Sequence, residues 1–390
     1  MFQKPFRDLN YSDIEKLKSD KICESPVLDY KRELLEDNNL LKHVIAFANT
    51  QGGILIFGIE ETGKGGYPKE IVGIDKNLIS KEKIEQVILS NTQPKLNIEI
   101  VQFDHVDPTK SIIAIQIPNN HLKPYMHGHY NKYYRRYNFE AQPMNEIEVS
   151  DAYGRRFAGY QEMENYISKT LSRLNIDEGK PYQHPQIIGK IIVIPTILSR
   201  MIETFDAKEF EWITALNFKP KFYGTSIISS NPTPSANGIK CQQMTQSGIC
   251  EDKLEIHRNG CIEYASYFGE AVEGKMLFLH HIFCIKLLYV LQLASILYQK
   301  KDYFGDVKVI CRLDLTHNSL LLDLKRNRGL DDYACEKNDI QTSREFSSNS
   351  LTSKYEYVAS GIMNDIFNSY GLWKCPLFDD EGNFKETELK

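Results

Sequence analysis

One apolar segment in the second half constrains the fold more than any other part of this 390-residue chain. Residues 276–297 read MLFLHHIFCIKLLYVLQLASIL, which is long enough to cross a bilayer as a helix. Lys286 falls near its middle and two histidines lie in its first half, and such side chains are costly in lipid. The segment is therefore predicted to be a helix buried in a protein core, with no membrane as partner.

Composition sets the class of protein. Hydrophobic residues make up 42% and charged residues 25%, as in globular proteins, and the length allows more than one domain. Because the net charge is -5, any binding of a polyanion requires a local basic patch. The eight cysteines show no CxxC spacing for a structural zinc site, and the N-terminal segment is too polar for a signal peptide. We expect reduced thiols and a cytoplasmic location.

Hydrophobic periodicity predicts a mixed α+β fold in the first half. Residues 38–50 have a helical apolar face, and the run ILIFGI at 54–59 is typical of a buried strand. A helix over 80–92 is predicted with Ser80 as its N-cap, and Asn49, Gly52 and Gly53 are interpreted as a structural turn. Further strands are predicted at residues 27–34, 96–104, 111–117 and 131–138.

The pattern of predicted strands and helices in the second half indicates a separate α+β module without a catalytic motif. A helical stretch from Met144 to Asn175 leads into a predicted linker, GKPYQHPQ, at 179–186. Arg258-Asn259-Gly260 between strand-like segments predicts a hairpin, and residues 335–353 are polar enough to predict a mobile loop. We expect an N-terminal domain over 1–150, a connecting helix and linker over 151–180, and a C-terminal regulatory, sensing or oligomerisation module over 181–390.

An acid and a lysine lie two residues apart in ESPVLDYKREL. On a strand, Asp29 and Lys31 project from the same face. Metal-dependent nucleases need carboxylates that hold a divalent ion and a cation that stabilises charge on the phosphoryl oxygens. Glu24 and Glu60 could add further acids if the neighbouring strands are adjacent. On spacing alone, the pair is more typical of a solvated strand face with a weak ion pair.

Several ordered segments resemble one family. ESPVLDYK, AFANTQGGILIFGIEE, VGI, IPNNHLKPYMHGHYNKYYRR and PMNEIE are similar to the Schlafen core domain, also called the Schlafen AlbA-like domain, over roughly residues 20–150. The resemblance implies an α/β fold with a mixed sheet and packed helices. It also implies a metal-dependent endoribonuclease that cuts tRNA and related structured RNA, with short prokaryotic members linked to anti-phage defence and expected to form homodimers.

The same resemblance assigns site residues. The family's acids fall on Glu24, Asp29 and Glu60, with the adjacent Glu61 as the alternative, and its lysine falls on Lys31. The implied cofactor is Mg²⁺ or Mn²⁺, held by the three acids. Asp29 stands where many members have Glu, and Glu60 where nucleolytic members commonly have Asp. A side chain longer or shorter by one methylene displaces the carboxylate by about an ångström. Such a displacement lowers catalytic activity but leaves the fold intact.

Basic and aromatic residues gather on the predicted strand NKYYRRYN. Alternation sends Tyr134 and Arg136 to one face and Tyr133 and Arg135 to the other, so that one face could meet RNA. The alternative is that one face fills the core while the charges stay in water. The residues expected to bind nucleic acid are Lys132, Tyr134, Arg135 and Arg136.

Three classes of function remain open. The first is an endoribonuclease acting on tRNA or other structured RNA, dependent on Mg²⁺ or Mn²⁺ and active as a homodimer. The second is a non-catalytic nucleic-acid-binding regulator with the same fold. The third is an interaction scaffold built around the C-terminal half.

Overall fold

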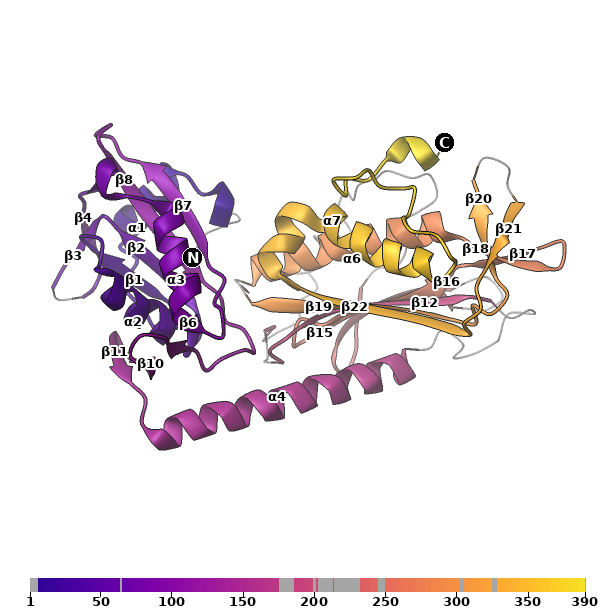
Figure 1. The fold of residues 1–390 in the computed structure, drawn as a ribbon, viewed down its shortest axis with the longest axis horizontal. Coiled ribbons are helices and arrows are strands. Elements are labelled where there is room, and N and C mark those ends of the chain that lie inside the picture. Colours follow the sequence, from indigo (N-terminus) through magenta and orange to yellow (C-terminus); the bar gives the residue numbers. More distant parts are fainter. Residues whose placement is uncertain are drawn as a thin grey trace. The chain divides into compact units, whose positions relative to one another are not determined.

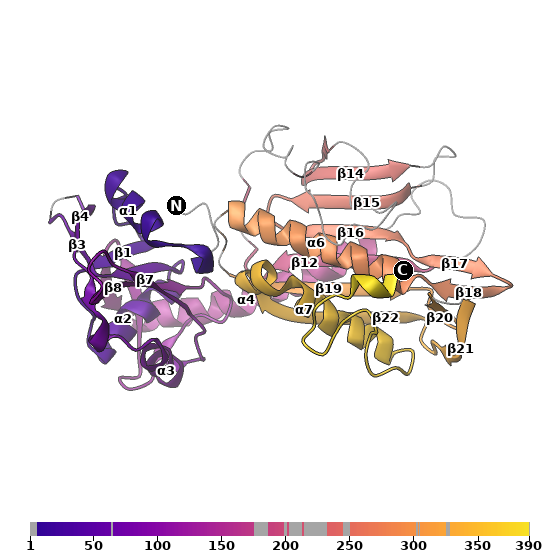
Figure 2. The ribbon, with the colours of Figure 1, turned by 90° about the horizontal axis from the view of Figure 1, so that it is seen from above.

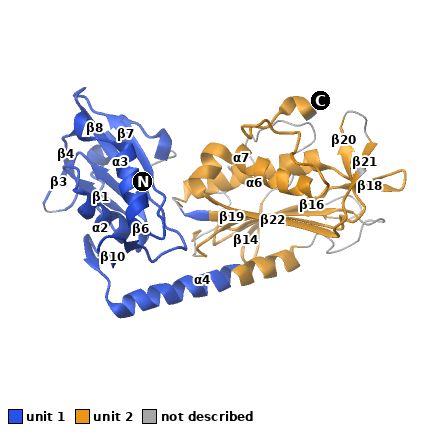
Figure 3. Ribbon diagram, viewed as in Figure 1, with its two compact units in different colours: residues 1–163, 304–306 blue, residues 164–303, 307–390 orange. Residues whose placement is uncertain are grey.

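A computed structural model gives two compact units, residues 1–163 with 304–306 and residues 164–303 with 307–390 (Figure 3). The described residues are 6–63, 65–174, 186–198, 201–202, 213, 232–244, 250–301, 303, 305–324 and 328–389. Both units combine helices with sheets, so the predicted α+β class is confirmed. Most of the predicted linker at 179–186 lies outside the described residues.

Unit 1 is built on a mixed five-stranded sheet (Figure 1). Its order is β1-β2-β8-β5, with β7 also pairing β8. Only the β1–β2 pair is parallel within this sheet. The strands are β1 (Leu28–Lys31), β2 (Gly53–Phe57), β5 (Ile74–Asp75), β7 (Glu99–Asp104) and β8 (Lys110–Ile117).

Each face of this sheet has its own helix and its own core. Leu55 and Phe57 pack with helix α2 (Asp37–Ala48), whereas Ile54 and Ile56 pack with helix α1 (Tyr11–Ser19). This alternation is the period-two pattern of a strand buried on both faces. Strand β2 is thereby fixed inside the unit, and β1 pairs beside it as the edge strand of the sheet.

Short elements surround the central sheet of unit 1. The hydroxyl of Ser80 accepts a hydrogen bond from Lys83 N at 3.1 Å and caps helix α3 (Lys81–Asn91), as predicted. Gly52 and Gly53 have φ of +69° and +143°, and a Cβ at either would meet backbone at 2.6 and 2.4 Å. Two smaller sheets comprise β3 (Ile59–Glu61) with β4 (Pro68–Ile71), and β11 (Glu140–Pro143), β10 (Lys132–Tyr137), β9 (Met126–His127) and β6 (Thr92–Gln93).

Unit 2 is a seven-stranded sheet covered by two helices on one face (Figure 2). The order is β13 (Thr233–Pro234), β14 (Gly238–Met244), β15 (Cys250–His257), β16 (Ile262–Tyr267), β12 (Ile188–Pro195), β19 (Asp306–Asp314) and β22 (Asp339–Ser347). A further sheet contains β17 (Gly269–Val272), β18 (Lys275–Phe278), β20 (Leu320–Asp323) and β21 (Arg328–Ala334). The predicted hairpin joins β15 to β16, where Gly260 has φ of +81°.

The two covering helices are α6 (His280–Lys300) and α7 (Ser348–Asn368). Helix α6 is long and apolar enough to cross a membrane, but 83% of its most apolar window is buried inside the protein. It is therefore the predicted core helix. The predicted mobile loop at 335–353 is wrong, because these residues form β22 and the start of α7.

A 28-residue helix, α4 (Glu146–Arg173), follows β11 and continues into unit 2. It is the helical stretch predicted from Met144 to Asn175. Met163 is the last residue of this helix assigned to unit 1.

Candidate functional site

The first element of the candidate site is the pair predicted on β1. Parallel pairing with β2 sets Asp29 opposite Leu55 and Lys31 opposite Phe57. The Asp29 side chain is 2% exposed, and its Oδ1 lies 2.6 Å from Lys31 Nζ. Alternation along the strand therefore brings the acid and the cation together, with Lys31 the more accessible of the two.

Two further side chains approach the same carboxylate. Arg136 Nη1 donates to Asp29 Oδ2 at 2.9 Å, and the Arg136 side chain is 1% exposed. Its guanidinium also lies 4.1 Å from the centre of the Phe47 ring. His43 Nδ1 lies 3.7 Å from Asp29 Oδ2. Burial and the nearby charge of Lys31 lower the pKa of His43 to about 4, so that the imidazole is neutral at pH 7.

Glu24 is held beside this pair from the preceding loop. Its backbone N–H donates to Gly66 O at 2.6 Å, and its Oε1 accepts from Tyr30 N at 2.8 Å. Burial, followed by contact with the Asp29 carboxylate, raises the pKa of Glu24 to about 8. Burial alone would raise the pKa of Asp29, but the hydrogen bond from Glu24 and the charge of Lys31 hold it below its usual range.

The two acids of β3 project in different directions. Glu60 pairs with Arg32 and, at 2.7 Å, with Lys69 Nζ. The hydrogen bond from Lys69 lowers the pKa of Glu60. Glu61 is exposed and its carboxyl group lies near that of Glu24, where it adds to the rise in the pKa of Glu24. The structure thus brings Glu24, Asp29, Lys31 and Glu61 into one cluster, named here the acidic cluster, and leaves Glu60 outside it.

The acidic cluster offers the ligand type of a divalent-ion site. Carboxylate oxygens are the ligands that Mg²⁺ prefers, and they also suit Mn²⁺. A cation among these acids would take the place of the proton that Glu24 retains. Within the described parts of the chain, no three acids of this cluster bring ligand atoms within 4.8 Å of one another. Glu24, Asp29 and Glu61 would hold the ion after their side chains close around it.

The basic and aromatic strand β10 shows the predicted alternation. Tyr134 and Arg136 are 7% and 4% exposed and face helix α2, whereas Tyr133 and Arg135 face the other side. Arg135 Nη1 lies 3.4 Å from Glu148 Oε1, and its side chain is 35% exposed. Lys132 is exposed at the start of the strand. Lys132 and Arg135 are accessible to a ligand. The burial of Tyr134 and Arg136 argues against the prediction that they contact nucleic acid directly, and Arg136 pairs with Asp29 instead.

His43 carried no signal in the sequence, and the contacts that Asn49 and Arg136 make were not predicted from it. His43 lies on a helix whose periodicity indicates only packing. The Asn49 side chain joins α2 to β10 by donating to Tyr134 O at 2.8 Å, and it also accepts from Tyr125 N at 2.6 Å. The residue pair Arg136 and Asp29 is 107 positions apart. Such contacts depend on tertiary packing and not on any local pattern.

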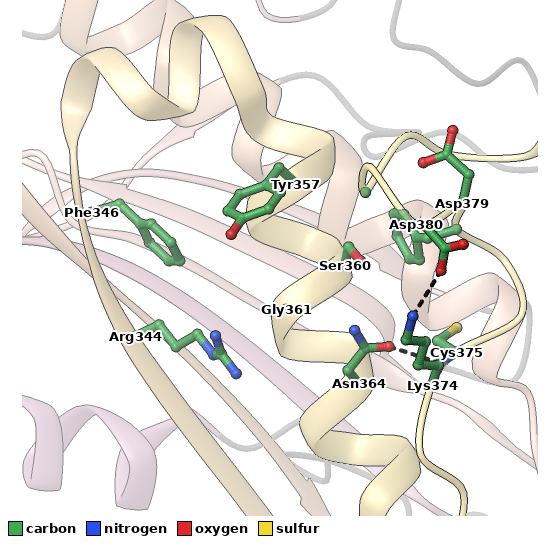
Figure 4. Close-up of a pocket in the computed structure, with 12 residues that line it drawn as sticks. Arg344, Phe346, Tyr357, Ser360, Gly361, Asn364, Lys374, Cys375, Asp379 and Asp380 are labelled. Atoms are coloured by element: carbon green, nitrogen blue, oxygen red, sulfur yellow. Dashed lines mark hydrogen bonds and ion pairs between the residues drawn. The ribbon is translucent and has the colours of Figure 1, made fainter.

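A separate pocket of about 240 Å³ lies in unit 2 between β22, α7 and the C-terminal segment (Figure 4). Lys374 Nζ pairs with Asp380 at 2.7 Å, and Asn364 Oδ1 accepts from Cys375 N at 2.8 Å. Arg344 holds Asp365 through two hydrogen bonds of 2.9 and 2.7 Å. Both cations of this pocket already have carboxylate partners.

Comparison with known proteins finds one family model that matches the part of the chain holding the acidic cluster. Residues 24–145 match the model of the family described as Schlafen, AlbA_2. The match begins at Glu24 and includes every residue of the cluster, together with β10. The family resemblance predicted from the sequence is therefore confirmed for this part of the chain.

Two solved structures align with part of the chain. The DIP2311 protein from Corynebacterium diphtheriae is 17% identical, with a TM-score of 0.26, over 36% of this chain and 27% of that one. The N-terminal domain of a protein described as related to the ATP-dependent DNA helicase RecG, from Nitrosomonas europaea, is 22% identical, with a TM-score of 0.23, over 29% and 74%. The chain thus spans about a quarter of the first structure's length. The search of curated proteins gave no match.

Proposed function

We propose that this Schlafen AlbA-like domain is a divalent-metal-dependent endoribonuclease that cuts structured RNA, with tRNA as its first candidate substrate. The observation that carries the proposal is the acidic cluster itself. Three carboxylates from two strands and a loop meet beside one lysine, and the lysine remains partly exposed with 26% of its side chain accessible. Acids that crowd together without full compensation are typical of functional sites.

Each residue has a distinct task in this proposal. Glu24, Asp29 and Glu61 would hold Mg²⁺ or Mn²⁺, which when bound supplies an activated water and polarises the phosphate. Lys31 stabilises the negative charge that develops on the phosphoryl oxygens. Arg136 and His43 are positioning residues, because they act through Asp29: Arg136 contacts it from the protein interior, and His43, whose side chain is 19% exposed, lies beside it.

RNA would reach the cluster over the accessible side of β10. Arg135, on the face away from α2, and Lys132, exposed at the start of the strand, carry positive charge, and Tyr137, which is 38% exposed, offers a ring for an unpaired base. Tyr134 supports this strand from the buried side. A local basic strand of this kind reconciles nucleic-acid binding with the net charge of -5.

The test is cleavage of tRNA by the purified chain with Mn²⁺. We expect cleavage by the wild type and none by Asp29→Ala. The matched control is Asp104→Ala at the end of β7, whose side chain is 84% exposed and pairs with Lys76. This control should cut at the wild-type rate. Absence of cleavage by the wild type, or equal cleavage by Asp29→Ala, removes the enzymatic proposal.

A non-catalytic nucleic-acid-binding regulator is the second candidate. Lys31 takes one oxygen of Asp29 and Arg136 takes the other, which leaves fewer lone pairs for an ion. Retained RNA binding without cleavage across Mg²⁺, Mn²⁺ and other divalent ions would favour this candidate. Its affinity would fall steeply with salt concentration, because phosphate contacts release counterions.

We also propose a cytoplasmic homodimer with a role in anti-phage defence, as short prokaryotic members of the family imply. All eight cysteines are free thiols and seven are buried, which suits a reducing compartment. Light scattering at micromolar concentration tests the assembly, and a strict monomer would contradict the dimer.

A further inference from the structure

A second group of metal-ligating side chains lies in unit 2, on the hairpin of β15 and β16. Glu255 and His257 project from the same face of β15, and antiparallel register sets Glu263 of β16 opposite Glu255. The three residues are 8%, 4% and 1% exposed respectively. Among the described residues, this is the one set of three whose ligand atoms all lie within 4.8 Å of one another.

The imidazole of His257 points into this group. Its Nε2 lies 3.0 Å from Glu263 Oε1 and 3.5 Å from Glu255 Oε2. It makes no hydrogen bond of acceptable geometry, although the atom is buried. Tetrahedral Zn²⁺ with bonds of about 2.0–2.1 Å keeps its ligand atoms roughly 3.3 Å apart, close to the separations found here. A buried imidazole nitrogen that faces two carboxylates without a well-formed hydrogen bond to either therefore points to an ion.

Other residues hold the carboxylates in place. Arg173 at the end of α4 donates to both oxygens of Glu263 at 2.8 and 2.7 Å, and Thr170 donates to Oε1 at 3.2 Å. Lys253 Nζ lies 3.4 Å from Glu255 Oε1. Metal-ligating carboxylates commonly accept such hydrogen bonds. Arg173 and Lys253 could either orient the carboxylates for an ion or neutralise them in place of an ion. Replacing one of these cations distinguishes the two roles.

We propose that Glu255, His257 and Glu263 bind one divalent transition-metal ion, for which Zn²⁺ is the probe. An imidazole and two carboxylates suit such an ion better than Mg²⁺, which prefers oxygen ligands alone. The ion would fasten the β15–β16 hairpin beside the end of α4. This site shares no residue with the acidic cluster, so the proposal stands independently of the nuclease.

Calorimetric titration of the full chain with Zn²⁺ tests the site, in an Asp29→Ala background that weakens binding at the acidic cluster. We expect one equivalent, and binding at least about tenfold weaker in His257→Gln. His317→Gln is the control, because His317 is exposed and its Nδ1 lies near only a backbone carbonyl. Co²⁺ should give the visible absorption of a tetrahedral site, which His257→Gln removes.

A second variant guards against loss of folding. Arg173→Gln removes a cation that contacts Glu263, so it should tighten Zn²⁺ binding if an ion and Arg173 share that carboxylate. Equal Zn²⁺ stoichiometry and affinity in the background variant and in His257→Gln, with no Co²⁺ absorption in either, would overturn the proposal. The three residues would then form only a buried ion-pair network with Arg173.

Discussion

Arg136 Nη1 lies 2.9 Å from Asp29 Oδ2, and both side chains are almost completely buried. Each therefore has little water to solvate its charge and depends on the other. The planar guanidinium fixes one oxygen of Asp29, while Lys31 takes the other at 2.6 Å. The orientation of the central acid of the cluster is thus set from strand β10.

Loss of Arg136 should destabilise unit 1. Arg136→Gln leaves the Asp29 carboxylate buried with one partner fewer, and breaking a buried pair costs about 3–5 kcal/mol. Urea denaturation gives the change in the free energy of unfolding. Arg135→Gln is the matched control, since its pair with Glu148 is partly exposed and is worth less than about 1 kcal/mol. Equal losses in the two variants would contradict the positioning role of Arg136.

The neighbouring acids of β3 should differ in their effect on RNA cleavage. Glu61 lies near Glu24 of the cluster and adds to the rise in its pKa, whereas Glu60 pairs with Arg32 and Lys69. Glu61→Gln should slow Mn²⁺-dependent cleavage by roughly two orders of magnitude, the scale of one lost electrostatic contact to a transition state. Glu60→Gln should leave the rate within a factor of about two to three, a difference smaller than 1 kcal/mol. A larger loss of cleavage in Glu60→Gln than in Glu61→Gln would identify Glu60 as the third metal ligand.

The accessible cations of β10 should govern the salt dependence of RNA binding. Lys132→Ala and Arg135→Ala should each reduce the slope of log affinity against log salt by about 0.7–0.9, the value for one phosphate contact. Lys374→Ala in unit 2, where the lysine pairs with Asp380, is the control. Fluorescence anisotropy over a salt series measures the slope. An unchanged slope in both β10 variants would favour the scaffold function.

Two buried histidines of α6 should make unit 2 sensitive to acid. Burial and the adjacent His281 lower the pKa of His280 to about 3, and burial lowers that of His281 to about 4. In the unfolded chain, both histidines bind protons as the pH falls below about 6.5, the ordinary histidine pKa. In the folded chain they stay neutral until about pH 4. Stability is therefore lost as pH falls through this window.

Thermal unfolding between pH 7 and pH 4.5 measures that loss. The double variant His280→Gln, His281→Gln should show a smaller fall in midpoint temperature than the wild type over the same range. An equal fall in both proteins would assign the acid sensitivity to other groups, such as Asp365, whose pKa is held low by Arg344 against the effect of burial.

Local patterns were sufficient to predict many elements of the fold. The cap at Ser80, the hairpin at 258–260 and the core helix at α6 each depend on residues close together in the sequence. Strand β22 was missed because it is an edge strand whose side chains are mostly polar. Ile340 is its one buried side chain. An edge strand can tolerate this composition, which resembles that of a loop.

The candidate site was predictable only in part. The alternation of side chains along a strand correctly put Asp29 and Lys31 on one face of β1. It also put Tyr134 and Arg136 on the face of β10 opposite Tyr133 and Arg135. It could not indicate which face of β10 is buried, because α2 covers that strand from a distant part of the sequence. The choice between Glu60 and Glu61 was not predictable, because the register of the β3–β4 pair shifts between these two residues and no local pattern indicates that irregularity.

The most direct measurement is an anomalous-scattering map from crystals of the full chain soaked in Mn²⁺. The account predicts a peak within about 2.5 Å of carboxylate oxygens of Glu24, Asp29 and Glu61, the range of metal–oxygen bonds. A peak at Glu263 would belong to the separate site of unit 2. An ion bound at Glu60, or no peak among these three acids at millimolar Mn²⁺, would contradict the central claim.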